Sequence, residues 1–196
     1  MSYTKLQLDG LKEIMNIGGG NAATSISKMI DSRIAMEVPE VQIMNYTDMY
    51  NKIISDDVEM HGVLSQIVGD LDGALLFVIS QDSANKMAKM MLGEDTTQTQ
   101  QLIQSAVMEL TNIIFNSFLR AIGDLVQMSL VSRLPIASYD YFGAIISSAY
   151  MAFEQYDEQI LVIHNEFTYG SENLDASLFL IPGIGVLEKI FKALGL

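Results

Sequence analysis

A ladder of spaced residues occurs twice in this chain, and it constrains the fold more than any other feature of the sequence. In the first copy, Asp9 is followed by Glu13, Asn16 and Pro39. The second copy has serine in place of the aspartate and otherwise repeats the residues and their spacing: Ser105, Glu109, Asn112 and Pro135. Every rung is displaced by 96 residues. The sequence therefore predicts a tandem duplication.

The spacing within each ladder places an acid and an amide together. Residues three and four positions apart lie on the same face of an α-helix. Core packing keeps apolar positions in register, but it does not require Glu and Asn at identical offsets. Each Glu–Asn pair is therefore interpreted as a site. The two prolines are given a structural role, at an edge or a bulge, because proline cannot donate a hydrogen bond to a β-ladder.

Each half is predicted to begin with a long helix that packs on one side and displays polar residues on the other. The first helix is expected to follow Thr4 as N-cap and to run to about Ile30, and the second to run from about Thr99 to Met128. Apolar residues recur at helical spacing along one side of each helix: Leu8, Leu11, Met15, Ala22, Ile26 and Met29, then Val107, Leu110, Ile114, Phe118, Ala121 and Leu125. The opposite side carries the ladders, which Gly20 and Asn116 extend.

Three consecutive glycines, Gly18, Gly19 and Gly20, interrupt the first helix. Each glycine in a helix interior costs roughly 1 kcal/mol relative to alanine. The run therefore predicts a close approach by another helix or a partner. A phosphate-binding loop is disfavoured, because no strand precedes the glycines and no Gly-Lys-Ser/Thr follows them.

The remainder of each half is predicted to contain strands and a short helix. Strands are expected at these ranges: 34–44, 60–68, 74–79, 136–147, 149–154, 159–167 and 176–181. A loop is expected over 45–57, and a polar joint between the halves over 94–101. A short helix capped by Asp82 or Ser83 should end at Gly93, and a last helix should run from Pro182-Gly183 to near Gly195. The fold class predicted is α+β, a pseudo-twofold tandem repeat with two long helices displayed on one face of a largely antiparallel β layer.

Composition narrows the classes of function. The net charge of −13 argues against nucleic acid and anionic membranes as partners. The chain has no cysteine, so thiol chemistry and cysteine–zinc sites are excluded, and its two histidines have no motif around them. The N-terminus lacks a signal-peptide core, and no apolar run is expected to approach the roughly 18 residues of a membrane span. A cytoplasmic protein without membrane insertion is expected. The thirteen methionines are interpreted as packing residues.

Glutamate and asparagine together suit a reaction whose bond is already labile. Asparagine cannot take up a proton, but its amide can orient a water molecule and stabilise developing charge. Hydrolysis of an acyl phosphate on another protein meets this description, since the work lies largely in placing a water in line with phosphorus. The residues alone leave a catalytic site and a duplicated helix-surface contact equally open. A metal site on Glu13 and Asp9 is disfavoured, because oxygen-only Mg²⁺ sites gather more carboxylates.

The two ladders resemble the signature of the CheC–CheX–FliY family of chemotaxis phosphatases. The resemblance extends to the stretch Leu11-Lys-Glu-Ile-Met-Asn-Ile-Gly-Gly-Gly-Asn-Ala-Ala-Thr and, through length and duplication, to the whole chain. Two intact sites resemble the CheC branch rather than CheX, which has one, and no further C-terminal domain of the FliY kind is expected. One departure is Gly19, where the family pattern has alanine. It should soften the first helix.

The resemblance implies one CheC-like domain over 1–196, with homologous halves 1–93 and 99–196. It implies dephosphorylation of the phosphorylated response regulator CheY, a hydrolase activity in chemotaxis and two-component signalling. Four residues would be catalytic: Glu13 and Glu109 would ion-pair with the regulator's lysine, and Asn16 and Asn112 would orient the attacking water. Asp9 and Ser105 would be accessory positions, and Pro39 and Pro135 structural ones.

The resemblance also implies which groups other proteins would supply. The chain would carry no cofactor of its own, and Mg²⁺ would sit on the regulator. The deamidase CheD is expected as a second partner, and the chain is expected to be a monomer. The alternative is a non-catalytic adaptor that binds CheD or the phosphorylated regulator.

Overall fold

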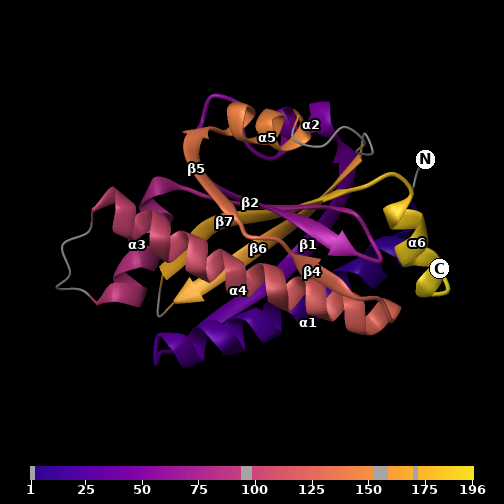
Figure 1. Cartoon of the computed structure of the whole chain (residues 1–196), viewed down its shortest axis with the longest axis horizontal. Coiled ribbons are helices and arrows are strands. Elements are labelled where there is room, and N and C mark those ends of the chain that lie inside the picture. Colours follow the sequence, from indigo (N-terminus) through magenta and orange to yellow (C-terminus); the bar gives the residue numbers. More distant parts are fainter. Residues whose placement is uncertain (1–2, 94–98, 152–158, 170–171) are drawn as a thin grey trace.

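The structure is a computed structural model that describes residues 3–93, 99–151, 159–169 and 172–196. Its helices are α1 (Lys5–Met29), α2 (Tyr46–Lys52), α3 (Gln81–Leu92), α4 (Gln100–Val126), α5 (Phe142–Met151) and α6 (Val186–Ala193). Its strands are β1 (Ile34–Asn45), β2 (Glu59–Gly69), β3 (Gly73–Ile79), β4 (Leu130–Ser132), β5 (Ile136–Tyr141), β6 (Gln159–Tyr169) and β7 (Glu172–Pro182). Figure 1 shows how they are arranged.

The strands form one sheet in which every pairing is antiparallel, as the sequence predicts. The order is β1-β6-β7-β3-β2-β4, and β5 continues from β4 along the same edge of β2. The hairpins β2–β3 and β6–β7 lie at the centre. The outer strand beside each hairpin comes from the opposite half of the chain: β1 pairs with β6, while β4 and β5 pair with β2. The two halves are therefore interlocked through the sheet.

The order of elements repeats along the chain. The first series is α1, β1, α2, β2, β3 and α3, and the second is α4, the β4–β5 segment, α5, β6, β7 and α6. β1 begins and ends 96 residues before the start of β4 and the end of β5, which is the offset of the sequence ladders. The sheet order is symmetric about the β7–β3 pair. This is the arrangement that a pseudo-twofold repeat requires.

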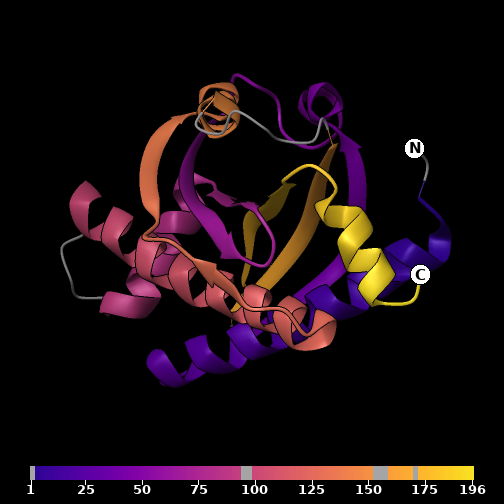
Figure 2. The same ribbon diagram turned by 45° about the vertical axis from the view of Figure 1, so that its right-hand side comes forward.

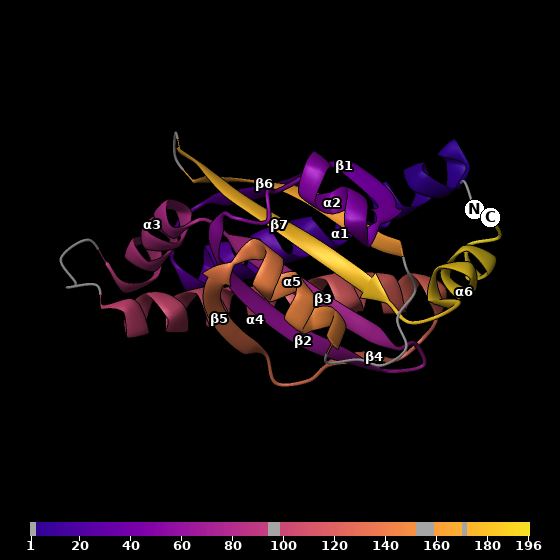
Figure 3. The ribbon, with the colours of Figure 1, turned by 90° about the horizontal axis from the view of Figure 1, so that it is seen from above.

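The helices cover the two faces of the sheet unequally. The long helices α1 and α4 lie side by side on one face, and α2 and α5 lie on the other (Figures 1 and 2). Figure 3, seen from the side of α2 and α5, shows the two long helices behind the strands. The larger core cluster fills the space between the sheet and α1, α3, α4 and α6. A smaller cluster lies under α2 and α5.

The two long helices run antiparallel (Figure 2). They pack closely at the first of the three glycines of α1. A Cβ added to Gly18 would lie 3.0 Å from the Cα of Phe118, so the backbones approach too closely there for a larger residue. Gly19 faces Met36 and Val38 of β1, and a Cβ on Gly20 would meet open space. The predicted close approach of a helix is therefore confirmed at the first glycine of the run.

The predicted N-cap of α1 is confirmed, and α4 has an N-cap of the same residue type. The Thr4 hydroxyl accepts a hydrogen bond from the Gln7 N–H, and the Gln7 side chain accepts one from the Thr4 N–H, which together form a capping box. The Thr99 hydroxyl accepts from the Leu102 N–H. The N-cap of α3 is Ser80, so the prediction of Asp82 or Ser83 is wrong.

Three predictions of local structure are wrong. The expected loop at 45–57 contains α2, which is anchored by the fully buried Met49. The expected strand over 136–147 stops at Tyr141, and α5 follows it. A short apolar run fits a buried helix as well as a strand. Here the buried residues fall at helical spacing: Phe142, Ile145, Ile146 and Ala149. The strand predicted at 149–154 is wrong as well, because residues 149–151 belong to α5. The remainder of that prediction and the joint at 94–98 lie outside the described residues.

Of the described helices, α4 alone has the length and apolar composition of a membrane span. Half of the most apolar 18-residue stretch of α4 is buried inside the protein. Its inner side carries most of the predicted apolar stripe, although Leu125 is exposed. Its outer side carries the second ladder. A helix of this kind at the centre of a globular core passes the same test of length and hydropathy.

Candidate functional site

The first Glu–Asn pair lies on the outer side of α1. Glu13 is exposed, and Asn16, one turn further along, is half-buried. The Val38 N–H of β1 donates a hydrogen bond of 3.0 Å to Oδ1 of Asn16. Because the backbone N–H can only donate, the amide must present its oxygen to the strand. The NH2 group of Asn16 forms no hydrogen bond within the described chain and is the end left for a partner.

The proline of the first ladder explains why a strand N–H is available to Asn16. Pro39 lies in β1, an edge strand, where the register with β6 shifts between Glu37 and Glu40. The predicted placement at an edge or bulge is therefore confirmed. A β-bulge leaves residues of the bulged strand without a hydrogen-bonded partner in the neighbouring strand. The Val38 N–H is released from pairing in this way and turns toward α1.

The second Glu–Asn pair lies at the corresponding place on α4. Glu109 is exposed and Asn112 is half-buried. The amide of Asn112 is held by a side chain rather than by the sheet. Nδ2 of Asn116 donates to Oδ1 of Asn112 at 3.1 Å and to its backbone oxygen at 2.8 Å. The Ser132 hydroxyl of β4 donates to Oδ1 of Asn116 at 3.4 Å.

The second proline also interrupts an edge strand. Pro135 separates β4 from β5, both of which pair with β2. At the gap the Arg133 N–H donates to the Gln66 carbonyl, and the Ser65 hydroxyl donates to the Arg133 carbonyl. Both backbone polar groups of Arg133 are therefore hydrogen-bonded. No N–H from this gap reaches Asn112 among the described residues.

The accessory positions of the two ladders are both at the surface. Asp9 is exposed on the first turns of α1. Ser105 is exposed on α4, and its hydroxyl donates to the Gln101 carbonyl one turn earlier. The serine hydroxyl is thus used within its own helix. Among the described residues, no group of three or more histidine and acidic side chains is placed to hold a metal ion.

A groove of about 680 Å³ adjoins the second site. Asn112 and Asn116 contribute to it from α4, and Asn21, Thr24 and Ser25 contribute from α1. The two α1 hydroxyls donate to carbonyls of their own helix. A partner that reaches Asn112 would therefore also touch the first long helix.

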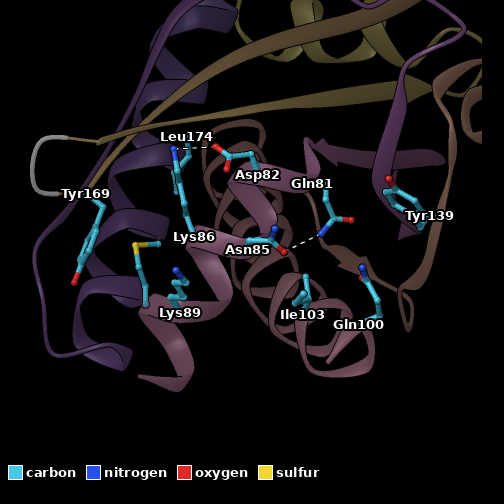
Figure 4. Close-up of a pocket in the computed structure, with 11 residues that line it drawn as sticks. Gln81, Asp82, Asn85, Lys86, Lys89, Gln100, Ile103, Tyr139, Tyr169 and Leu174 are labelled. Atoms are coloured by element: carbon cyan, nitrogen blue, oxygen red, sulfur yellow. Dashed lines mark hydrogen bonds and ion pairs between the residues drawn. The ribbon is translucent and has the colours of Figure 1, made fainter. Parts of the chain in front are cut away.

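A separate cavity of about 880 Å³ lies beside α3 and does not include the predicted site residues (Figure 4). Gln81 and Asn85 are hydrogen-bonded at its wall at 2.8 Å. Gln81 also bonds the Nε2 of the buried His61 at 3.0 Å, and the Tyr139 ring packs on the imidazole. Burial lowers the pKa of His61, and the bond to Gln81 opposes that shift. This cluster joins α3 to β2 and β5.

Sequence reasoning placed all four predicted catalytic residues at the surface of the two long helices, where the structure has them. It missed the groups that hold the two amides. Asn116 was noticed on the polar stripe of α4 but was given no role. The signal available was its departure from the repeat, because Gly20 stands 96 residues earlier. The Val38 N–H could not be found from side-chain identity, since any residue but proline supplies one.

The fold is shared with solved structures of FliY, FliM and CheX proteins. The Thermotoga maritima FliY structure matches with a TM-score of 0.77 and 18% identity, covering 100% of this chain and 98% of that one. The FliM middle domain from H. pylori matches at 0.65 and 13%, covering 97% and 99%. The chemotaxis protein CheX from Desulfovibrio desulfuricans matches at 0.56 and 15%, covering 86% and 99%. The chain therefore has the fold of these FliY, FliM and CheX structures.

The sequence comparisons specify the family. Residues 62–138 match the family described as "Chemotaxis phosphatase CheX", and residues 6–43 match the "CheC-like family". The chain is 30% identical over 196 residues to the CheY-P phosphatase CheC of Bacillus subtilis (strain 168), covering 96% of this chain and 94% of that protein. The chain belongs to the CheC family.

Proposed function

We propose that the protein is a phosphatase that removes the phosphoryl group from the aspartate of a CheY-like response regulator. The observation that carries the proposal is the pair of half-buried asparagines, each beside an exposed glutamate and each held by its oxygen. The relation to the CheY-P phosphatase CheC supports the substrate class. The residues of each site can account for the chemistry as follows.

The asparagine NH2 group acts as a fixed donor. It positions a water in line with phosphorus and stabilises the charge that develops on oxygen during attack. The water forms a new bond to phosphorus, the bond from phosphorus to the aspartate oxygen breaks, and inorganic phosphate leaves. No general base is needed from this chain, because the acyl phosphate bond is already labile. Asn16 would do this at the first site and Asn112 at the second.

The glutamate provides the recognition charge. Glu13 or Glu109, exposed one turn before its asparagine, would pair with a lysine beside the regulator's phosphoaspartate. A charge-assisted hydrogen bond of this kind is about twice as strong as a neutral one. The pairing also places the asparagine over the phosphoryl group. Mg²⁺ would be held by the regulator, with none required from this chain.

Three further proposals rest on the family relation. The deamidase CheD would be a second partner, the chain would act as a monomer, and the protein would work in the cytoplasm. Light scattering of the purified protein, alone and after mixing with CheD, measures both the monomer mass and the complex.

The experiment that tests the function follows the decay of a phosphorylated CheY-like regulator in Mg²⁺, with and without the protein. The parent chain should accelerate the release of inorganic phosphate, and the variant with Glu13→Ala and Glu109→Ala should not. Binding of the phosphorylated regulator without faster release would instead indicate an adaptor. Equal release by the parent and by the variant that also carries Asn16→Ala and Asn112→Ala would overturn the catalytic proposal.

A further inference from the structure

Asn116 lies beside the second site and has no counterpart with a side chain at the first. At the second site it lies one helical turn after Asn112 and is exposed to solvent. At the first site the position 96 residues earlier is Gly20, whose missing side chain faces open space. A surface asparagine is a weaker helix former than most residues. Its position on α4 therefore calls for a reason beyond helix formation.

The hydrogen bonds of Asn116 fix which way the amide of Asn112 points. The backbone oxygen of Asn112 can only accept, so Asn116 must turn its NH2 group toward it. The same NH2 group faces the Asn112 side chain, which must therefore present its oxygen. The Ser132 hydroxyl, donating to the other end of Asn116, favours the same orientation.

The amide of Asn112 therefore has the same orientation as the amide of Asn16 at the first site. There the Val38 N–H binds the amide oxygen of Asn16 directly. In both sites an N–H donor holds the oxygen, and the NH2 group makes no hydrogen bond within the described chain. Two unrelated donors produce one orientation of the asparagine amide. A function that requires a free NH2 donor explains this agreement.

We propose that Asn116 is a positioning residue for the second site: it holds Oδ1 of Asn112 so that the NH2 group faces the regulator's phosphoryl group. The proposal rests on the function proposed above and adds to it the group that orients the second asparagine. Asn116 acts through Asn112 and makes no contact with the reacting atoms. The first site needs no such residue, because the bulge at Pro39 supplies a backbone donor.

The test uses the full chain with Asn16→Ala, so that the second site alone reports. Asn116→Asp keeps the size of the side chain and removes its NH2 donor. Asn116→Ala removes the side chain with no loss of helix propensity. Each should lower kcat for phosphate release about tenfold, which corresponds to about one hydrogen bond, and should leave KM within twofold. Ser117→Ala is the matched control. It removes the hydrogen bond that the Ser117 hydroxyl donates to the Ile113 carbonyl, and it should leave kcat and KM unchanged.

A double-mutant cycle separates positioning from an independent role. Asn116→Ala should have no further effect once Asn112 is alanine, because no amide is left to orient. Additive losses would show that Asn116 contacts the regulator itself and would overturn the proposal. Unchanged kcat in both Asn116 variants would also overturn the positioning proposal. If Asn112→Ala still lowers kcat in that case, the proposed phosphatase function stands. The midpoint of urea unfolding, measured for every variant, shows that the compared chains are folded.

Discussion

The two Glu–Asn sites have the same residues at the same spacing, but different parts of the molecule hold them. On α1 the asparagine is bound by the backbone of an edge strand at a bulge. On α4 the asparagine is bound by a side chain of its own helix, which a strand hydroxyl supports from the other side. The comparison indicates that orientation of the amide is the feature common to both sites. The group that provides it is free to differ.

The strands beside the two sites also differ. β1 exposes Glu37 and Glu40 near its proline. The positions 96 residues later hold Arg133 and Ile136, and Ile136 is 71% exposed. Leu134, which corresponds to the buried Val38, is 90% exposed. The strand beside the first site therefore presents two acids, whereas the strand beside the second presents one cation and two exposed apolar side chains. The two sites should differ in their affinity for one regulator.

The largest loss of kcat/KM is expected from substitutions of the two glutamates. Like charges brought together at an interface cost several kcal/mol. Glu109→Lys in the chain with Asn16→Ala, and Glu13→Lys in the chain with Asn112→Ala, should each lower kcat/KM about 10³-fold. Glu→Gln at the same positions is the matched control and should cost less, because it removes attraction without adding repulsion. Equal kcat/KM for the Lys and Gln variants would show that no cation of the regulator meets the acid.

The next largest effect concerns the packing of the two long helices. Gly18→Leu forces a side chain against Phe118 and should destabilise the chain by about 3 kcal/mol, the upper range for an overpacked core. Gly20→Ala is the control on the open side of the same helix and should stabilise it by about 1 kcal/mol. Urea unfolding measures both. Similar free energies of unfolding for the two variants would contradict the close approach at Gly18.

A pH titration examines the His61 cluster, which joins α3 to β2 and β5. Burial lowers the pKa of His61, so the folded chain keeps this imidazole neutral at a pH where the unfolded chain protonates it. Its contribution to stability is therefore complete above pH 6.5 and falls as the pH drops toward the lowered value. The slope can reach about 1.4 kcal/mol per pH unit. His61→Gln should remove this component between pH 7.5 and about 5.5, and an unchanged slope would contradict it.

The smallest effects are expected at the two helix N-caps. Thr4→Ala and Thr99→Ala should each cost about 1 kcal/mol of stability. The Thr4 variant should lose more, because the Thr4 hydroxyl both accepts from the Gln7 N–H and donates to the Gln7 side-chain oxygen, whereas the Thr99 hydroxyl accepts a single bond. Thermal unfolding of the two variants measures the difference. A larger loss at Thr99 would reverse the expected order.

Much of the fold was predictable because periodic signals are long in this chain. The helices α1 and α4 follow apolar stripes with recognisable caps, and β3 is a buried run between turn residues. The segment from Phe142 to Met151 was not predictable, because ten mostly apolar residues fit a strand or a helix until their burial is known. The interlocking of the halves was also hidden, since a sequence does not show which strand pairs with which.

The candidate site was predictable to the same degree. The ladders located the four side chains on exposed helix faces, because spacing alone determines the face. The orientation of each amide was not accessible, since it depends on contacts between segments far apart in the sequence. Val38 acts through its backbone, and Asn116 acts only because α4 places it one turn from Asn112.

The most direct measurement is the initial rate of phosphate release from a phosphorylated CheY-like regulator with four chains: the parent, Asn16→Ala, Asn112→Ala and the double variant. The regulator is kept well below KM, and spontaneous release is subtracted. Two independent sites predict that the rates of the single variants add up to the parent rate. The double variant should be slower by about 10²–10³-fold, the loss expected for one orienting donor at each site. A double variant as fast as the parent, or a single substitution that removes all activity, would contradict two working sites.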